Sequence, residues 1–199
     1  MYDDMNKLIV LFFCLALSKA AMAQKDSLAL DEHGKYIYYK IVSMNKYTAD
    51  TLYQRSLRFF KNIADKKSLK ITSADPGNMG LAGTGFFTVY KTAITKHPDG
   101  QIAYQLKLEV KDAKYRYWLT NFVYTPYFRD RYNNYVPQNN VEVPLEKLSK
   151  NIAEKDLNSY LDESALFGRQ LGERLKKYLT NVVVVEKKAV PKVISIGKW

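Results

Sequence analysis

The chain has 199 residues, with 31 Lys and Arg against 20 Asp and Glu, and its formal net charge is +11. The length favours one domain, and a hydrophobic fraction of 47% excludes wholesale disorder. Because the chain holds one Cys and two His, a disulfide scaffold and a Cys-based metal site are excluded, and a zinc enzyme is disfavoured.

The N-terminus has the three parts of a secretory signal peptide. Lys7 supplies a positive charge, residues 8–17 form an apolar run, and residues 21–23 (Ala-Met-Ala) are a small-x-small cleavage site before Gln24. The run of ten apolar residues falls short of the roughly 20 that a membrane-spanning helix needs. We therefore predict that residues 1–23 are a signal peptide.

The single cysteine, Cys14, belongs to this segment. Phe12 and Phe13 precede it, whereas lipoprotein signals place small residues before the cysteine, so we interpret Cys14 as a hydrophobic residue of the signal. Cleavage between Ala23 and Gln24 leaves a thiol-free chain, which suits an oxidising compartment. We expect a periplasmic or extracellular protein that is not lipid-anchored.

The first part of the exported chain is typical of a strand, a helix and a second strand. Residues 34–44 (GKYIYYKIVSM) are rich in Tyr, Ile and Val, as strands are. A helix follows Thr48, whose hydroxyl can cap it, and Tyr47 can pack onto its first turn. The apolar stripe of this helix contains Tyr53, Leu57, Phe60 and Ala64. After the helix, residues 68–74 are predicted to form a short strand.

Residues 75–85 (DPGNMGLAGTG) contain four Gly and precede a strand over 86–95. A phosphate cradle aims backbone N–H groups at the anion from a loop that leads into a helix. Here the segment leads into a strand, and no Lys-Ser or Lys-Thr pair follows as in a P-loop. We therefore predict a flexible connection or a bulged start of the strand.

Two further strands follow. Residues 97–100 (HPDG) predict a turn, which would leave His97 in solvent. A tight reversal over 111–114 leads into a strand over 115–125 that is aromatic on both faces. The strand over 101–111 alternates between apolar and polar residues, as in a half-buried antiparallel sheet, and its apolar face consists of Ile102, Tyr104, Leu106, Leu108 and Val110.

Residues 126–144 have no regular period and hold the best candidate for binding. Tyr and Arg supply rigid contact area and charged donors, and both are enriched at binding hot spots. The alternative is an ordered loop that packs its Tyr rings onto its own sheet. The candidate ligand-binding residues are Tyr127, Arg129, Arg131, Tyr132 and Tyr135.

From Leu145 onward the chain is typical of a helix, and an apolar stripe with intervals of four and three runs through residues 157–178. Ser164 and Gly168 lie within this stripe, so the helix can approach a sheet closely there. The order of strand, helix, four strands and long helix predicts an α+β fold.

We predict a single two-layer domain over residues 24–185, followed by a basic tail over 186–199. Sequential strands joined by tight turns favour an antiparallel sheet of about five strands. A short and a long amphipathic helix can cover only one face of such a sheet.

The assembled segments resemble a known family. They are residues 31–39 (DEHGKYIYY), the helix after Thr48, and residues 114–122 (KYRYWLTNF) before a long C-terminal helix. They are similar to a family of exported Bacteroidota proteins described as a domain of unknown function with a TBP-like fold. The resemblance implies a curved antiparallel sheet and brings no activity and no catalytic residues. The fold's name refers to a DNA-binding protein, but a fold by itself does not transfer function.

The sequence contains no recognisable catalytic, metal or cofactor constellation. His33 lies beside Asp31 and Glu32, but no second ligand or nucleophile stands at a fixed spacing from it. Asp162 and Glu163 are adjacent on the predicted helix and so do not face each other. We predict no cofactor.

The positive charge is concentrated at the C-terminus. Residues 174–199 contain seven basic residues and one acidic residue, which argues against a uniformly basic nucleic-acid binder. An exported protein would also rarely meet genomic DNA, so we expect no nucleic acid as partner. A solvated helix end and tail is one interpretation of the charge, and contact with an anionic membrane surface is the other.

We therefore predict an exported, non-catalytic binding or interaction module of the bacterial envelope. Its partner would be an envelope protein, a peptide or a glycan, held on the exposed sheet face or on the Tyr/Arg segment. The alternatives are a hydrolase acting on an envelope polymer, which requires a deep pocket with perturbed ionisable groups, and an electrostatic anchor to anionic lipid or polysaccharide.

Overall fold

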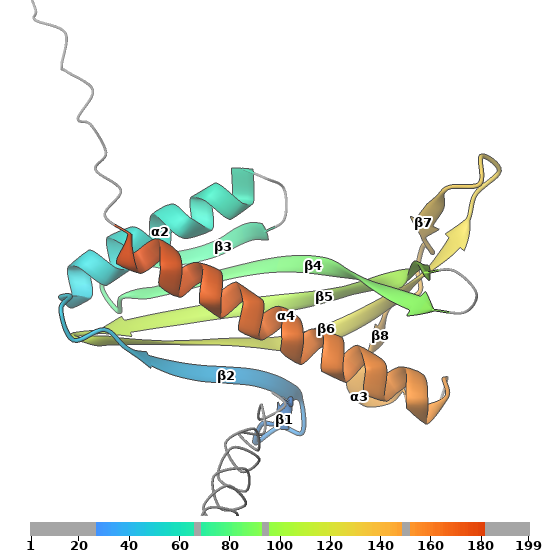
Figure 1. The fold of residues 1–199 in the computed structure, drawn as a ribbon, viewed down its shortest axis with the longest axis horizontal. Helices are drawn as coiled ribbons and strands as arrows, with labels where there is room; N and C mark the ends of the chain where they lie inside the picture. The colour runs from blue at the N-terminus through green and yellow to red at the C-terminus, as the bar shows by residue number, and fades with distance from the viewer. Residues whose placement is uncertain (1–26, 66–68, 93–95, 149–151, 182–199) are drawn as a thin grey trace, which may run out of the picture.

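The computed structural model describes residues 27–65, 69–92, 96–148 and 152–181 (Figure 1). The predicted signal peptide with its cleavage site, and the predicted basic tail over 186–199, lie outside the described residues. Among the described residues, no helix is long and apolar enough to cross a membrane.

The described part of the chain forms an antiparallel sheet of eight strands with three helices. The strand order is β1-β2-β6-β5-β4-β3, and β7 and β8 pair with β6. In chain order the elements are β1 (Ala29–Leu30), β2 (Tyr36–Ser43), α2 (Ala49–Asp65), β3 (Leu69–Asp75), β4 (Gly80–Thr92), β5 (Lys96–Lys111), β6 (Lys114–Arg129), β7 (Tyr135–Pro137), β8 (Val143–Pro144), α3 (Leu145–Leu148) and α4 (Glu154–Thr180).

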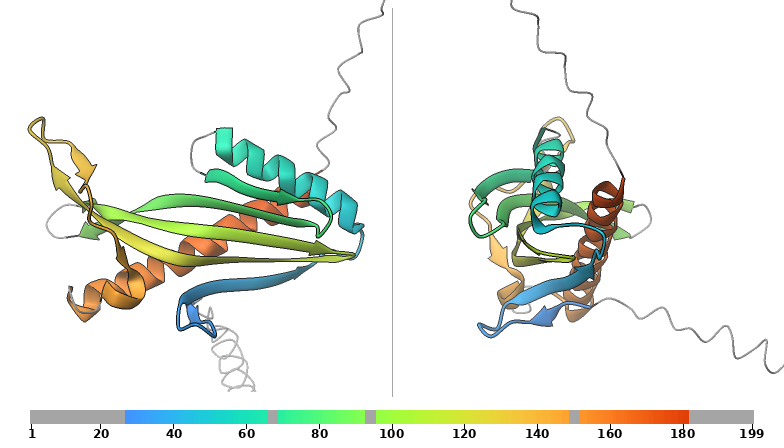
Figure 2. Two further views of the ribbon diagram at one scale, coloured as in Figure 1. Left: turned by 180° about the vertical axis from the view of Figure 1, so that it is seen from behind. Right: turned by 90° about the vertical axis from the view of Figure 1, so that its left-hand side faces the viewer.

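The helices α2 and α4 lie on one face of a curved sheet, and α4 crosses that face diagonally (Figures 1 and 2). None of the described helices covers the opposite face. The predicted α+β class with helices on one face is confirmed. The sheet has eight strands and not about five, because β1, β7 and β8 have only two or three residues each and leave no periodic signal.

The core lies between the sheet and the helices. The alternation predicted for residues 101–111 is confirmed, because the five residues of the apolar face are buried in β5. The helix α2 begins as expected, since the backbone N–H of Thr51 donates a hydrogen bond to Thr48 Oγ1 at 3.4 Å. The face of α2 that packs on the sheet buries Leu52, Tyr53, Phe59 and Phe60.

The helix α4 approaches the sheet closely at two glycines. A Cβ atom at Gly168 would lie 2.6 Å from the ring of Tyr38, and one at Gly172 would clash with the hydroxyl of Tyr117. The Tyr117 hydroxyl instead donates a hydrogen bond to the Gly168 carbonyl oxygen at 3.3 Å. Buried Ser164 lies on the same face. The predicted close approach is therefore confirmed, and it depends on residues without bulky side chains.

The segment over 75–85 was expected to be a flexible connection or a bulged start of the strand, and the flexible connection is wrong for most of its length. The register shift in the β3–β4 pairing lies between Ile71 and Ser73 of β3. Only residues 76–79 form a turn, and β4 begins at Gly80 and pairs with β3 on one side and with β5 on the other. Gly83 favours close packing, because a Cβ atom there would lie 3.0 Å from the carbonyl oxygen of Lys70 and would crowd β3. The glycines of β4 thus let neighbouring strands approach closely, although a Gly-rich composition is typical of a loop.

Two other expectations need correction. Residues 97–100 are not a turn, because β4 and β5 pair as far as Thr92 and Lys96, and His97 is half-buried with its ring 5.8 Å from that of Tyr135. The helical region that begins at Leu145 consists of two helices, α3 and α4. Ala153, which precedes α4, has an extended backbone.

We predict that Gly172→Ala destabilises the fold. The new Cβ would push against the Tyr117 hydroxyl, and overpacking of this kind costs about 1–3 kcal/mol. This cost exceeds the gain of at most about 1 kcal/mol from replacing Gly by Ala in a helix. Gly80→Ala is the control, since its Cβ would meet no heavy atom within 4 Å. Urea unfolding followed by circular dichroism measures both variants, and a Gly172→Ala protein as stable as wild type would contradict the close packing.

Candidate functional site

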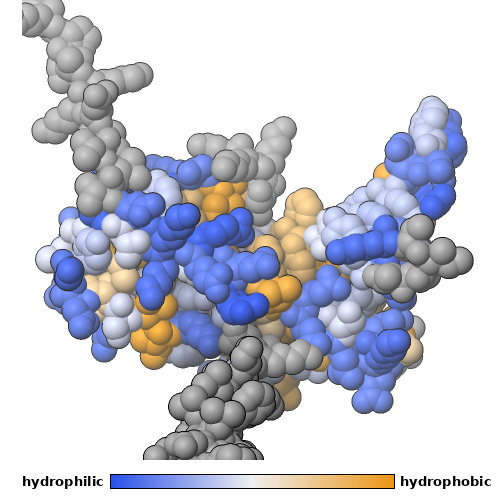
Figure 3. Space-filling view, in the orientation of Figure 1, coloured by the Kyte–Doolittle hydropathy of each residue, from blue (hydrophilic) through white to orange (hydrophobic). Residues whose placement is uncertain are grey.

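The Tyr/Arg segment, expected to be irregular, is a β-hairpin. The strand β6 continues to Arg129, and β7 pairs with it through Tyr127 and Pro137, Phe128 and Val136, and Arg129 and Tyr135. Figure 1 shows this hairpin projecting from one end of the sheet, and Figure 3 shows that its outer part is polar. The missing regular period has a physical reason: the projecting strands have no single buried face that would impose alternation.

The hairpin tip is held by its own hydrogen bonds. The Asp130 carboxylate accepts the backbone N–H groups of Asn134 and Tyr132, each at 2.8 Å, and these bonds lower the pKa of Asp130. Asn133 has a positive φ of 64°, which asparagine adopts readily in a turn. The tip is therefore a preorganised turn.

The structure divides the five predicted ligand-binding residues into two groups. Tyr127 donates a hydrogen bond to Gln101 Oε1 of β5 at 3.2 Å and so joins the base of the hairpin to the sheet. Arg129 donates one to the Tyr135 hydroxyl at 2.8 Å and so links the two strands of the hairpin. Tyr132 lies at the tip and is 69% exposed, with the Arg131 guanidinium 4.7 Å from its ring centre. Tyr132 and Arg131 are thus presented to solvent as a pair.

A second surface lies on the sheet face opposite the helices, and we call it the Trp118 face. Register places Tyr39 of β2 beside Trp118 of β6, and Trp118 beside Lys107 of β5. The ring centres of Tyr39 and Trp118 are 6.4 Å apart. The cationic groups of Lys107 and Arg116 lie 5.9 and 5.5 Å from the Trp118 ring centre. Two aromatic rings and two cations thus share one side of the sheet.

The charges on the Trp118 face are not balanced by its acids. The Glu109 carboxylate accepts a hydrogen bond from Arg116 Nε at 2.8 Å, which raises the pKa of Arg116. No ion pair to Lys107 is found among the described residues. A hollow of about 180 Å³ lies next to the Arg116–Glu109 pair, and its lining residues are Tyr39, Ile41, Glu109, Lys111, Lys114, Tyr115 and Arg116. Ile41 is 60% exposed there.

The Gly-rich start of β4 contributes to this face by being small. Gly80 pairs with Glu109, Ala82 pairs with Lys107, and Thr84 pairs with Gln105, so these β4 residues lie beside the Trp118 face. None of them carries a side chain larger than that of threonine. A ligand resting on Trp118 and Lys107 would meet no bulky side chain from these three positions of β4.

Sequence reasoning identified the exposed sheet face as a candidate but not its central residues. Trp118 and Tyr39 lie far apart in the chain, and only the register between β2 and β6 brings them together. The sequence did contain a signal for this face. Tyr115, Tyr117 and Leu119 alternate with Arg116 and Trp118, which places Arg116 and Trp118 on the sheet face opposite the core.

A group of ionisable residues at the start of α4 is a structural cluster. The Asp99 carboxylate accepts hydrogen bonds from the hydroxyls of Tyr124 and Tyr160, and Lys91 lies 3.7 Å from it and 3.0 Å from Asp156. Burial raises the pKa of Tyr124 to about 12. The hydrogen bond to Asp156 raises the pKa of Lys91. These groups satisfy one another and join α4 to the start of β5.

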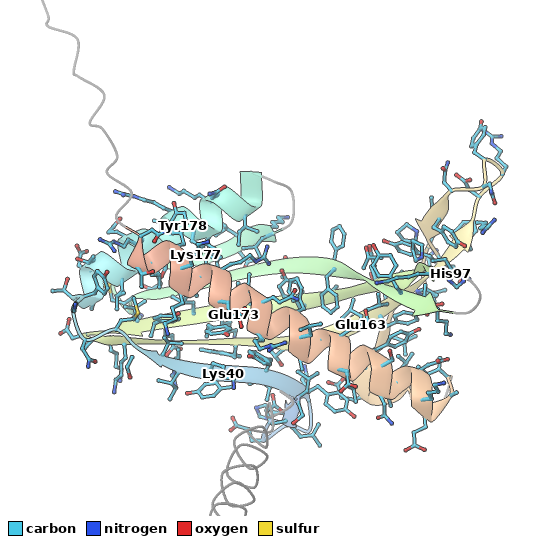
Figure 4. All side chains as sticks on the ribbon, in the orientation of Figure 1. Lys40, His97, Glu163, Glu173, Lys177 and Tyr178 are labelled. Carbon is cyan, nitrogen blue, oxygen red and sulfur yellow. The ribbon has the colours of Figure 1, made fainter. Side chains whose placement is uncertain are left out.

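The other titratable candidates remain separate. His33 is exposed near the start of β2. His97 lies at the start of β5 (Figure 4). Burial raises the pKa of Glu163 on α4, while its neighbour Asp162 is exposed. Within the described ranges, no group of three or more His, Cys, Asp or Glu side chains could hold a metal ion.

We predict that stability falls above about pH 10, where a free tyrosine begins to ionise. Burial holds the pKa values of Tyr104 and Tyr124 at about 12, so the unfolded chain loses these protons first. Each phenol then lowers the free energy of unfolding by up to about 1.4 kcal/mol per pH unit. The raised pKa of Lys91 acts in the same direction, because its contribution is complete below the unfolded pKa and lost above it.

Urea unfolding at about pH 9 and about pH 11 measures this dependence. Tyr124→Phe removes one ionising group and should give a smaller loss than wild type. Tyr132→Phe is the matched control because its hydroxyl is exposed at the hairpin tip. Equal losses in all three proteins would show that the buried phenols do not cause the effect.

Comparison with known proteins supports the fold. Residues 38–125 match the family described as "Domain of unknown function (DUF4468) with TBP-like fold". A crystal structure of a DUF4468 family protein from Bacteroides ovatus ATCC 8483 is similar with a TM-score of 0.58 and 13% identity, over 77% of this chain and 91% of that chain. A TBP-like protein from Parabacteroides distasonis ATCC 8503 gives a TM-score of 0.60 and 15% identity, over 77% and 97%. No curated protein matches. The predicted family resemblance is confirmed, and the two structures show the fold alone.

Proposed function

We propose that this chain, whose residues 38–125 are a DUF4468 domain with a TBP-like fold, is an exported, non-catalytic binding module of the bacterial envelope. The observation that carries the proposal is the Trp118 face, where two aromatic rings and two cations stand on a sheet surface that no described helix covers. Such a surface suits an extended peptide or glycan that lies flat on it.

The composition of the Trp118 face supports binding. Aromatic side chains contribute large contact area at low entropic cost, and Trp, Tyr and Arg dominate binding hot spots. Arg116 is already oriented by Glu109, so little freedom is lost when a ligand contacts it. The small residues of β4 leave access to Trp118 and Lys107 from the side of that strand.

The hairpin tip is the second part of the proposed binding surface. Tyr132 and Arg131 are presented on a turn that is ordered by Asp130 before any partner arrives.

The proposed export rests on the signal-like N-terminus. The expectation that nucleic acid is not a partner rests on the same export.

Cross-linking in intact cells followed by pull-down tests this function. We expect that Tyr39→Ala with Trp118→Ala abolishes capture of the main partner, because the aromatic contact area is lost. Lys107→Gln with Arg116→Gln keeps the rings and should weaken the capture. Arg131→Ala with Tyr132→Ala shows whether the hairpin takes part.

Leu166→Ala is the control, since this exposed residue lies on α4, away from both surfaces. Circular dichroism verifies that each variant is folded. An unchanged set of partners in the Trp118-face variants and in the hairpin variant would refute the proposed binding module.

A second candidate is an electrostatic anchor, favoured by the seven basic residues against one acidic residue over 174–199. Attraction to an anionic surface amounts to about 1 kcal/mol per basic residue close to it and is screened by salt. Deletion of residues 187–199 should therefore sharply reduce salt-sensitive binding to phosphatidylglycerol vesicles in a flotation assay. Equal flotation of the two proteins would reject the anchor and leave the binding module untouched.

A further inference from the structure

A groove lies between α2 and α4, on the side of the molecule opposite the Trp118 face. The two helices cross near the C-terminal end of α4 and diverge from there (Figure 1), and Figure 3 shows hydrophobic surface between them. The groove has a volume of about 340 Å³, which is within the size range of small-molecule sites. Its lining includes Phe59 and Ile63 from α2, Tyr104 from β5, and Phe167, Arg174 and Tyr178 from α4.

The aromatic walls of this groove are already packed against one another. Phe59 and Tyr178, one from each helix, have ring centres 5.5 Å apart. Phe167 lies 5.0 Å from Tyr104 and stacks on Phe87 at 4.4 Å. These contacts hold the walls from both helices and from the sheet, so an apolar ligand would enter a largely preformed space.

Two polar groups in this groove have no partner in the part of the chain that the structure describes. Tyr104 is only 4% exposed as a whole residue. Its hydroxyl makes no hydrogen bond with a described residue, and its oxygen is not fully buried, so it is open to the groove. Arg174 stands at the groove without an ion pair among the described residues, and its charge opposes the effect of burial on the Tyr104 pKa. Burial nevertheless holds that pKa at about 12, so the hydroxyl is a hydrogen-bond donor at neutral pH.

We propose that this groove binds a small amphiphilic monoanion, a carboxylate or sulfonate that carries an aryl or alkyl group. The apolar part lies between Phe59, Phe167 and Tyr178. The acid group accepts hydrogen bonds from the Arg174 guanidinium and the Tyr104 hydroxyl. A charge-assisted hydrogen bond of this kind is stronger than a neutral one, and it gives the Tyr104 hydroxyl an acceptor that the described residues do not supply.

Charge and size favour this occupant over others. The unpaired groups are a cation and a hydroxyl donor, which together complement an anion and not a cation. The groove volume suits a molecule of the size of a medium-chain fatty acid and not a folded domain. The site is separate from the Trp118 face, so it does not depend on the proposed function.

Fluorescence titration of the full exported chain with 1-anilinonaphthalene-8-sulfonate tests the proposal, with dodecanoate as competitor. We expect saturable binding at one site per chain and displacement by dodecanoate. Arg174→Gln should lower the affinity for both anions about tenfold. Its affinity for the neutral probe N-phenyl-1-naphthylamine should stay within about twofold of the wild-type value. Tyr104→Phe should lower the affinity for the anions in the same selective way.

Three variants make the result specific. Ile63→Trp fills the groove from its half-buried rim and should abolish binding of both probes while circular dichroism stays unchanged. Arg169→Gln removes an equivalent charge from α4 that does not line this groove and should have no effect. Trp118→Ala should also leave probe binding unchanged, which separates this site from the proposed binding module.

Several outcomes would overturn the proposal. One is the absence of saturable binding, and another is equal affinity of the wild type and Arg174→Gln for dodecanoate. Binding that appears only after deletion of residues 182–199 would show that the chain's own C-terminal segment is the occupant. Probe binding that appears only on dilution, together with dissociation of an oligomer, would assign the groove to a second copy of the chain.

Discussion

The structure depends on the close contact between α4 and the sheet at Gly168 and Gly172. The rings of Tyr38 and Tyr117 occupy the space that two Cβ atoms would fill, and the Tyr117 hydroxyl is bonded to the helix backbone. Burial of two large aromatic side chains is a dominant favourable term in folding. The contact also fixes where the long helix crosses the sheet, and thereby which surfaces remain open.

The Trp118 face and the groove between α2 and α4 both follow from this arrangement. Side chains alternate along a strand, so the residues next to Tyr38 and Tyr117, which are Tyr39 and Trp118, point away from α4. The strands that hold the helix on one side therefore display aromatic rings on the other side. On the helix side, α4 diverges from α2 toward its N-terminus, and the space between the helices becomes the aromatic groove. One packing contact thus separates two surfaces of different chemistry.

Periodic segments could be predicted and segments with irregular composition could not. The alternation in β5, the stripe of α2 and the close approach at Ser164 and Gly168 each reflect one buried face, which leaves a repeating signal. The Gly-rich segment and residues 97–100 have turn-like compositions, yet both lie largely in strands, and the Tyr/Arg segment contributes to β6, β7 and β8. Pairing with a neighbouring strand outweighed local preference there, because it satisfies backbone groups that composition does not reveal.

The sequence by itself determined the α+β class, the family resemblance and the covering of the sheet by helices on one face. It also identified the Tyr/Arg segment as a candidate for ligand binding. Each of these depends on local periodicity or on which residue types are present. Only the tertiary structure decided that Trp118 lies beside Tyr39 and Lys107, that Asp99 joins two tyrosines and a lysine, and that Tyr104 and Arg174 meet in one groove. These neighbours come from different elements, so their proximity is set by strand register and helix packing, which no local pattern encodes.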